Sequence, residues 1–441
     1  MKNVVAISLL ALLAQVAHAQ IIDAKETAKQ KSEQRANNNI DRGIDNVFDR
    51  TEQGIGNLFK KKKSKQKSQP DSPEADTSQD SNNQLPESSQ KTNQGNTPTG
   101  VPQGTATFKA YSKFDFVSGE KTLYFDNFER LDVGDFPADF NSNASGEVVA
   151  IDGKDGKWLA LTANGTFIPE AMGKLPDNFT LEFEVGIDVD PSNNYSGFGL
   201  AFNTNAKELF NNGSSYAPGS YLYLHPGGNG SASFTVTQSD GSVLENGFQM
   251  PQWSAAGNNF AKISVWRQKG RLRVYVNETK LMDLPRFFID TNPYYTAFYR
   301  HFMGECKVFV TNVNYAIGAP DTRSKLITEG RFSTTGIKFD SGSDKIKADS
   351  YGSLKAIADV LKENPGVRVK IIGHTDSDGN ADKNLELSKK RAASVKNALT
   401  VEFAIEPARL ETDGKGQTNP VEQNTSSVGK ANNRRVEFIK L

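Results

Sequence analysis

One stretch of the chain, residues 68–104, contains almost nothing that a folded core could bury. Of its 37 residues only Ala75, Leu85 and Val101 are apolar, six are charged, and 28 are Ser, Thr, Asn, Gln, Pro or Gly. So little apolar surface cannot offset an ordering cost of roughly 1–2 kcal/mol per residue, so the stretch is predicted to be a disordered linker. A coil of this length spans roughly 30–35 Å and can act as a tether between the segments on either side.

Residues 1–19 have the pattern of a signal peptide. Lys2 precedes the apolar run Val4–Val16, and a small-x-small pattern ends at Ala19, which predicts cleavage before Gln20. The run is too short to cross a bilayer. We therefore expect export to the periplasm or the cell surface.

Residues 20–67 are polar and helix-prone, with one thin apolar stripe and a cluster of lysines at the end. Two interpretations stay open for this segment. Residues 40–67 form an amphipathic helix that lies on an anionic membrane or docks on a partner, or they form a solvated helix whose lysines only confer solubility. The apolar and basic positions are Ile40, Ile44, Val47, Phe48, Ile55, Leu58, Phe59, Lys60, Lys61, Lys62, Lys63, Lys65 and Lys67.

Charge and side-chain chemistry narrow the classes of function. The 52 basic residues equal the 52 acidic ones, so the net charge gives no reason to expect a nucleic-acid partner. Cys306 is the single cysteine and cannot form an intramolecular disulfide. With few histidines in the mature chain as well, we expect neither a Cys/His metal site nor a cofactor.

Residues 105–318 consist of short alternating segments separated by Gly, Asn, Asp and Pro, which predicts an all-β antiparallel sandwich. Residues 262–277 have the pattern of a hairpin that turns near Lys269 and Gly270. A membrane barrel is disfavoured because most segments are shorter than ~9–11 residues and are interrupted by charge. The predicted strands are Thr180–Val189, Tyr195–Phe202, Tyr221–Leu224, Ser231–Val236, Ala261–Arg267 and Leu272–Val276, and the inward-facing hairpin positions are Ile263, Val265, Leu272, Val274 and Val276.

Together with Phe125–Glu129 near its start and Leu281–Pro285 after the hairpin, this region resembles the concanavalin-A-like, laminin-G-like jelly roll. The resemblance implies a domain that binds a glycan or a protein, and it leaves calcium binding and glycan cleavage open, because fold alone does not decide function.

Paired carboxylates raise the alternative of a glycan hydrolase. Glu182 and Glu184 are alternate residues of one predicted strand, and Asp188 and Asp190 have the same spacing, which a retaining glycosidase can use. A laminarinase-like catalytic site would have a tight cluster of acidic residues with a neighbouring Trp, and the sequence around Glu182 does not match that pattern. The sequence therefore favours a surface role, in which these acidic side chains face solvent and the apolar residues between them face the core. The sequence leaves two roles open for four aromatic residues, which either stack on sugar rings or belong to the core. They are Trp253, Tyr294, Tyr295 and Tyr299.

Residues 325–441 change to alternating strand and helix patterns. The expected elements are a strand ending at Gly336–Asp340, a helix over 348–362, a strand over 367–371, a second helix over 387–399 and a closing strand over 435–441. This order predicts a compact α/β sandwich of the β-α-β-α-β type.

The motifs of this region resemble the OmpA-like peptidoglycan-binding family. They are Ile372–Asp376 (IGHTD), Asn384–Ala392 (NLELSKKRA), Gly414–Gly416, Pro420 and Asn433–Glu437 (NRRVE). The resemblance implies binding of the wall stem peptide, chiefly its diaminopimelate residue, without making or breaking a bond.

The same resemblance assigns roles to four residues. Asp376 would bind the ligand ammonium, Arg391 its carboxylate, and Asn384 would add a hydrogen bond. At Gly342, where some members have Asn, only a backbone contact remains. His374 is expected to be structural, and Arg434 and Arg435 to pair with carboxylates that hold the last strand.

The predicted organisation is therefore multidomain: signal peptide, helical and disordered N-terminal segment, all-β jelly roll, and C-terminal OmpA-like α/β domain. The predicted function is that of a non-enzymatic envelope protein of the outer membrane or periplasm that tethers the jelly roll, or the outer membrane, to peptidoglycan.

Overall fold

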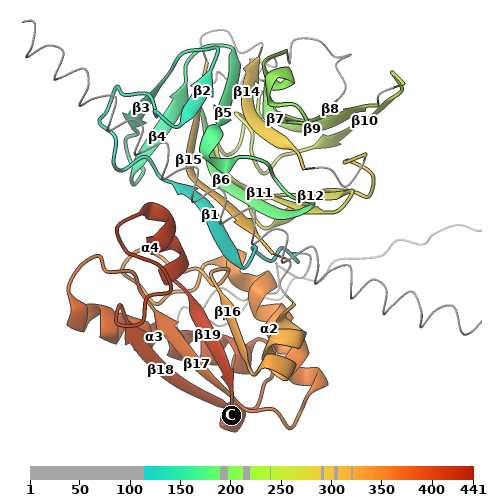
Figure 1. Cartoon of the computed structure of the whole chain (residues 1–441). Coiled ribbons are helices and arrows are strands. Elements are labelled where there is room, and N and C mark those ends of the chain that lie inside the picture. The colour runs from blue at the N-terminus through green and yellow to red at the C-terminus, as the bar shows by residue number, and fades with distance from the viewer. Residues whose placement is uncertain are drawn as a thin grey trace, which may run out of the picture. The chain divides into compact units, whose positions relative to one another are not determined.

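The computed structural model describes residues 114–188, 197–211, 219–238, 240–289, 293–301, 306–318 and 321–441 (Figure 1). The predicted signal peptide, the segment 20–67 and the linker 68–104 lie outside the described residues, as does Asp190. Within the described ranges, no helix is both long and apolar enough to span a bilayer.

The middle region consists of two antiparallel sheets that share one core. The first sheet has the order β13-β12-β11-β6-β15-β4-β3 with β1 paired to β15, and the second has the order β10-β9-β8-β7-β14-β5-β2. Phe183 of the first sheet lies 5.0 Å from Phe298 of the second, measured between ring centroids, and both belong to the same apolar cluster. We call these two sheets the sandwich. Its strands are β1 (Lys121–Asp126), β2 (Phe140–Ser142), β3 (Gly146–Ala150), β4 (Lys157–Leu161), β5 (Gly165–Pro169), β6 (Asn178–Asp188), β7 (Gly197–Asn203), β8 (Gly219–His225), β9 (Ser231–Thr237), β10 (Val243–Gln249), β11 (Phe260–Gln268), β12 (Arg271–Val276), β13 (Thr279–Leu284), β14 (Tyr295–His301) and β15 (Lys307–Ile317).

The hairpin pattern predicts the pairing of β11 with β12 correctly. Lys269 and Gly270 separate the two strands, and Lys269 has a left-handed φ of 55°. All five predicted inward positions of the hairpin are fully buried.

The exposed edge strand β10 was not predicted, because its residues lack an alternating buried face.

The C-terminal region forms a four-stranded sheet of order β16-β19-β17-β18 (Figure 1). Helices α2 and α3 contact each other and share one core with this sheet. The elements are β16 (Arg331–Thr334), α2 (Tyr351–Glu363), β17 (Val369–His374), α3 (Ala381–Val401), β18 (Leu410–Gly416), α4 (Ser427–Asn433) and β19 (Val436–Lys440).

The predicted β-α-β-α-β order is incomplete. It lacks β18 and α4, and its first strand is placed too late, since β16 ends at Thr334 and only an isolated bridge joins Phe339 to Ile346. Strand β18 was not predicted because it is polar and contains glycines, so it has no apolar alternation. The glycine at position 414 is required by close packing of α3, since a Cβ there would lie 2.4 Å from the backbone nitrogen of Lys389. The short helix α4 has no apolar periodicity that a sequence could reveal.

Candidate functional site

Strand β17 leads directly into the loop that carries Asp376. The Asp376 side chain is 13% exposed, and its Oδ2 atom lies 2.7 Å from Nη1 of Arg434. Its Oδ1 atom accepts a hydrogen bond of 3.1 Å from the backbone N–H of Asp378. Because an ionised carboxylate has about four lone-pair positions, these two contacts leave Asp376 able to accept from a ligand ammonium.

Arg391 projects from α3 toward the loop after Phe339. Its Nε donates to the carbonyl oxygen of Ser343 at 2.9 Å and its Nη2 to that of Asp340 at 3.4 Å, while the guanidinium carbon lies 4.8 Å from the centre of the Phe339 ring. Burial lowers the pKa of Arg391, and the nearby Asp376 carboxylate raises it. A cation and an anion on two different elements therefore lie within electrostatic reach of each other.

Asn384 has a positioning role in this structure. Its side chain is buried, and Nδ2 donates to the carbonyl oxygens of Asp376 (3.3 Å) and Asp378 (2.9 Å) and to Oε1 of Gln417 (2.8 Å). The amide therefore holds the Asp376 loop against α3. The sequence alone does not distinguish this positioning role from direct contact with a ligand.

The family resemblance implies binding to the cell wall. On that basis, replacing Asn384 with Ala is expected to weaken this binding by about 1–3 kcal/mol, because the loop loses the donor that fixes its carbonyl groups. Co-sedimentation of the mature protein with purified sacculi measures this change. Asn397→Ala on the exposed face of the same helix is the matched control. An unchanged affinity in Asn384→Ala would exclude this positioning role.

The loop at Gly342 flanks Arg391. Gly342 has a φ of 63°, in the left-handed region, and no atom lies within 4 Å of the position that a Cβ would take. The backbone donors at the start of α3 are already engaged, because Oδ1 of Asn380 accepts from the N–H groups of Asp382 and Lys383. These two N–H groups are therefore not free to bind a ligand carboxylate.

The two arginines of the NRRVE motif have different partners. Arg435 pairs with Glu437 on β19, as expected for a residue that holds the last strand. Arg434 instead pairs with Asp376, and its guanidinium carbon lies 5.4 Å from the Phe125 ring centre. The predicted pairing of Arg434 with a carboxylate is therefore confirmed, and its partner is Asp376 in the loop after β17. Only the tertiary structure brings it to Asp376, 58 residues away in sequence.

His374 is buried and lies 3.5 Å from Glu437, measured between Nε2 and Oε1. Burial, followed by the charge of Arg435, lowers the pKa of His374 to about 4. The imidazole is therefore neutral at pH 7.

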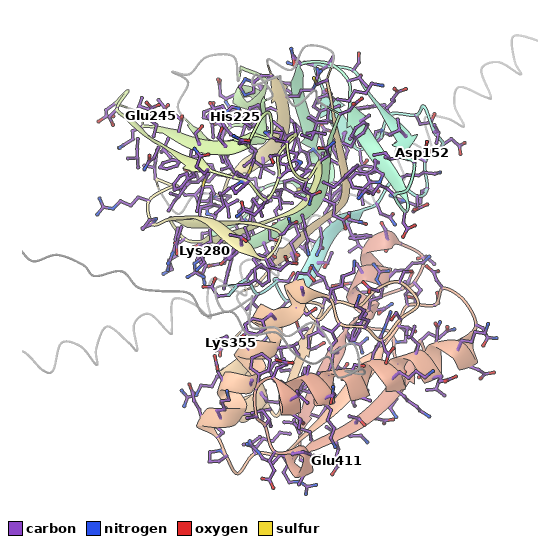
Figure 2. The ribbon with its side chains drawn as sticks, turned by 180° about the vertical axis from the view of Figure 1, so that it is seen from behind. Asp152, His225, Glu245, Lys280, Lys355 and Glu411 are labelled. Atoms are coloured by element: carbon purple, nitrogen blue, oxygen red, sulfur yellow. The ribbon has the colours of Figure 1, made fainter. Side chains whose placement is uncertain are left out.

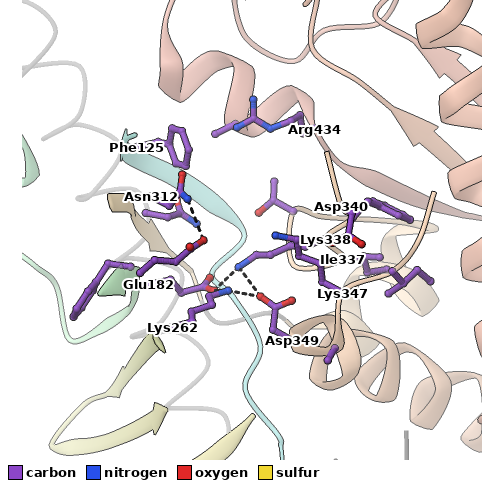
Figure 3. A pocket seen from close by; sticks show the side chains of 18 of the residues that line it. Phe125, Glu182, Lys262, Asn312, Ile337, Lys338, Asp340, Lys347, Asp349 and Arg434 are labelled. Carbon is purple, nitrogen blue, oxygen red and sulfur yellow. Dashed lines mark hydrogen bonds and ion pairs between the residues drawn. The ribbon is translucent and has the colours of Figure 1, made fainter. Parts of the chain in front are cut away.

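A cavity of about 750 Å³ lies beside this site (Figure 3). Arg391, Arg434 and Asp340 line it from the C-terminal region, and Phe125, Glu184 and Asn312 line it from the sandwich. The C-terminal region and the sandwich are joined around the cavity by direct contacts. Asn432 of α4 accepts from the N–H of Thr122 and donates to its carbonyl oxygen.

Four charged side chains form a cluster at the edge of the cavity, in which Glu182 is buried and the other three are half-buried. Oε2 of Glu182 lies 2.7 Å from Nζ of Lys262 and also pairs with Lys338, and Asp349 pairs with both lysines (Figure 3). Glu182 is 2% exposed, and Ser118 donates to its second oxygen. The expectation of a solvent-facing Glu182 is therefore wrong, because the C-terminal region covers this face of β6.

Burial alone would raise the pKa of Glu182, but the ammonium groups of Lys262 and Lys338 lower it to about 2. The cluster contains two carboxylates and two ammonium groups, so its charges balance. No group of three or more His, Cys, Asp or Glu side chains suited to a metal occurs in the described ranges.

A second hollow, of about 490 Å³, lies on the second sheet of the sandwich. Figure 2 labels two of the residues that line it, His225 and Glu245. The rings of Tyr223 and His225 are stacked on β8, with an interplanar angle of 2°, and His301 of β14 meets both edge to face. Glu245 lines the hollow from β10. Of the four aromatic residues that sequence analysis left open, Trp253, Tyr294 and Tyr299 are buried and Tyr295 is half-buried.

The comparisons with known proteins concern the C-terminal region only. Residues 338–434 match the OmpA family. We call this region the OmpA domain, and the match confirms the resemblance drawn from its motifs.

Three relatives show the extent of the similarity. The chain is 44% identical over 102 residues to the probable lipoprotein YiaD of Escherichia coli, covering 23% of this chain and 46% of the relative. It is 40% identical over 98 residues to the peptidoglycan-binding protein ArfA of Mycobacterium bovis, covering 22% of this chain and 29% of the relative. The crystal structure of the peptidoglycan-associated lipoprotein from Burkholderia pseudomallei has 31% identity and a TM-score of 0.22, covering 24% of this chain and 86% of that one. The chain thus spans less than half the length of the two curated relatives.

Proposed function

We propose that this protein is a non-enzymatic component of the bacterial cell envelope that binds peptidoglycan through its OmpA domain and connects the sandwich to the wall. Its place is the outer membrane or the periplasm, as for its relatives. The observation that most supports the proposal is that Asp376 and Arg391, the oppositely charged residues of the motifs, lie within electrostatic reach of each other in a region that matches this family.

The ligand of this site is the diaminopimelate residue of the stem peptide. Diaminopimelate carries ammonium and carboxylate groups on one extended chain, so it needs a fixed anion and a fixed cation. Asp376 accepts from the ammonium, and the Arg391 guanidinium donates to the carboxylate. Arg434 keeps the Asp376 carboxylate oriented through its 2.7 Å contact. Gly342 contributes backbone only, in the loop that Arg391 holds.

Competition tests this assignment. The mature protein should co-sediment with purified sacculi that contain diaminopimelate, and free diaminopimelate should release it. Sacculi with lysine in place of diaminopimelate lack one carboxylate and should bind more weakly. A wild-type protein that stays in the supernatant with every sacculus preparation would refute the function.

We further propose that the protein breaks no bond. A retaining hydrolase needs a protonated carboxylic acid as general acid, and a pKa of about 2 keeps Glu182 ionised. Glu184 is held by Asn312, whose Nδ2 donates to its Oε1 at 3.0 Å. Release of reducing sugar or of peptide fragments from a panel of glycans and sacculi would overturn this proposal and favour the alternative, a wall-anchored glycan hydrolase.

For the sandwich we propose a jelly-roll fold of the concanavalin-A-like type that binds a neutral glycan in the hollow at Tyr223. Aromatic rings can stack on sugar faces, and Glu245 and the imidazoles can bond sugar hydroxyl groups. Burial and the neighbouring His225 lower the pKa of His301 to about 4, so its ring is uncharged at pH 7. The residues that line the hollow include one carboxylate and neither Lys nor Arg, so the hollow favours a neutral sugar over an acidic one.

Replacing Tyr223 with Ala is expected to weaken glycan binding about tenfold, because one stacking ring is lost. An array of neutral oligosaccharides measures this loss, and Tyr295→Ala on β14, outside the hollow, serves as a control. If the wild-type protein binds no oligosaccharide, the hollow is not a glycan site.

A further inference from the structure

The cavity beside Arg391 has a second wall that belongs to the sandwich. Glu184 of β6, Asn312 of β15 and Phe125 of β1 line the same space as Arg391, Arg434 and Asp340 of the OmpA domain (Figure 3). Its volume of about 750 Å³ lies within the range of sites that enclose whole ligands. Arg391 lines this space and Asp376 does not, so a diaminopimelate residue held by both would enter the space only at its Arg391 end.

The sandwich wall is built around a β-bulge. The register between β15 and β6 shifts between Thr311 and Asn314, and Asn312 within the bulge has a left-handed φ of 50°. Bulges of this kind redirect side chains, and strained residues are retained mostly where they serve a purpose. Here the bulge places the Asn312 amide on the cavity wall, where it donates to Glu184.

Polar atoms around the cavity also lack partners within the described part of the chain. They are Nε1 of Trp158, Oγ1 of Thr335, Oδ1 of Asp349 and Nδ1 of His374. All four residues line the cavity, and the four atoms are fully buried. Atoms with almost no accessible surface do not face open space, so these four lie behind the cavity wall. The polar character of the wall itself comes from side chains such as Asn312, Glu184 and Arg391.

The interface that positions this wall is fixed by direct bonds. The charge cluster of Glu182, Lys262, Lys338 and Asp349 joins β6 and β11 to the OmpA domain, and Ser427 of α4 donates to the carbonyl oxygen of Phe125. The sandwich wall therefore faces the OmpA domain in a defined position.

We propose that the sandwich completes the peptidoglycan site, with Asn312 and Glu184 contacting the stem-peptide residues that precede diaminopimelate. An amide beside a carboxylate supplies both a donor and acceptors, which matches the C=O and N–H groups of a peptide backbone. This inference rests on the proposed function, since Arg391 and Asp376 hold the diaminopimelate end of the same ligand. It makes the sandwich part of the recognition surface, in addition to any ligand of its own.

A comparison of two ligands tests the proposal. The probes are free meso-diaminopimelate and the tripeptide L-Ala-γ-D-Glu-diaminopimelate, with affinities measured by calorimetry on the mature protein. The wild-type protein should bind the tripeptide about tenfold more tightly, which is what one or two added hydrogen bonds supply. In the double variant Glu184→Ala, Asn312→Gly, this advantage should vanish while the affinity for diaminopimelate stays within about twofold.

Glycine at position 312 tolerates the left-handed φ and so preserves the bulge. Glu129→Ala, at an exposed glutamate of the sandwich outside both cavities, is the matched control. An undiminished tripeptide advantage in the double variant, or none in the wild type, would overturn the inference and leave the proposed function intact. Failure of the wild type to bind either probe would instead overturn the proposed function.

Discussion

Replacing Arg391 with Ala is expected to reduce the affinity of the protein for sacculi by a factor on the order of 30 to 1,000 or more. The ligand carboxylate would be desolvated without a partner, at a cost of about 2–5 kcal/mol. Arg391→Lys should also bind sacculi much more weakly. A lysine ammonium cannot form bidentate hydrogen bonds with the ligand carboxylate and also reach the carbonyl oxygens of Ser343 and Asp340.

Co-sedimentation with sacculi across a range of protein concentrations measures this loss. Arg368→Ala is the matched control, since Arg368 is an exposed arginine of the same domain that pairs only with Glu411. Circular dichroism should show that Arg391→Ala remains folded, because Arg391 lies outside the domain core. A folded Arg391→Ala variant that sediments like the wild type would remove the assignment of the site.

The second large effect concerns stability. Replacing Glu182 with Gln is expected to lower the free energy of unfolding by about 3–5 kcal/mol, because Lys262 and Lys338 would then share the single carboxylate of Asp349 in a buried position. Urea unfolding, followed by tryptophan fluorescence for the sandwich and by helical circular dichroism for the OmpA domain, measures the loss. Glu411→Gln removes an exposed ion pair of the OmpA domain and should cost less than about 1 kcal/mol.

The same residue predicts how stability depends on pH. The pKa of Glu182 is about 2 in the folded protein against an ordinary value of 4.5, so the folded state binds this proton less tightly than the unfolded state. The stabilisation, about 3 kcal/mol, is complete above pH 4.5 and is lost as the pH falls from 4.5 toward 2. Glu182→Gln should lack this part of the acid transition. An identical acid transition in variant and wild type would show that Glu182 is not the group responsible.

The charge cluster also bears on how the wall site should be assayed. Lys338 and Asp349 belong to the OmpA domain, yet both pair with residues of the sandwich. A fragment limited to residues 325–441 would expose these two charges together with the surface around them. Measurements on the mature chain therefore describe the site with its second wall in place.

Much of the site could be predicted from sequence because its residues occur in local motifs. The strand before Asp376 and the helix that carries Arg391 have clear periodic patterns, and Leu354, Ile357, Ala358 and Leu361 are buried as the helical spacing predicts. The hairpin of β11 and β12 was predictable for the same reason. In these segments one face of the helix or strand packs against the core, so the spacing of apolar residues predicts the type of element.

The sequence by itself determined the all-β class of the middle region, the α/β class of the C-terminal region, the motifs of the OmpA domain and the residues that carry the two opposite charges of the proposed site. Only the tertiary structure decided that Arg434 pairs with Asp376, that Asn384 braces the loop, that Glu182 is buried and that the sandwich forms a second wall. These contacts join residues 8 to 156 positions apart, on loops and on polar faces. Polar side chains without periodicity leave no local pattern in a sequence, since their partners are fixed by how whole elements pack.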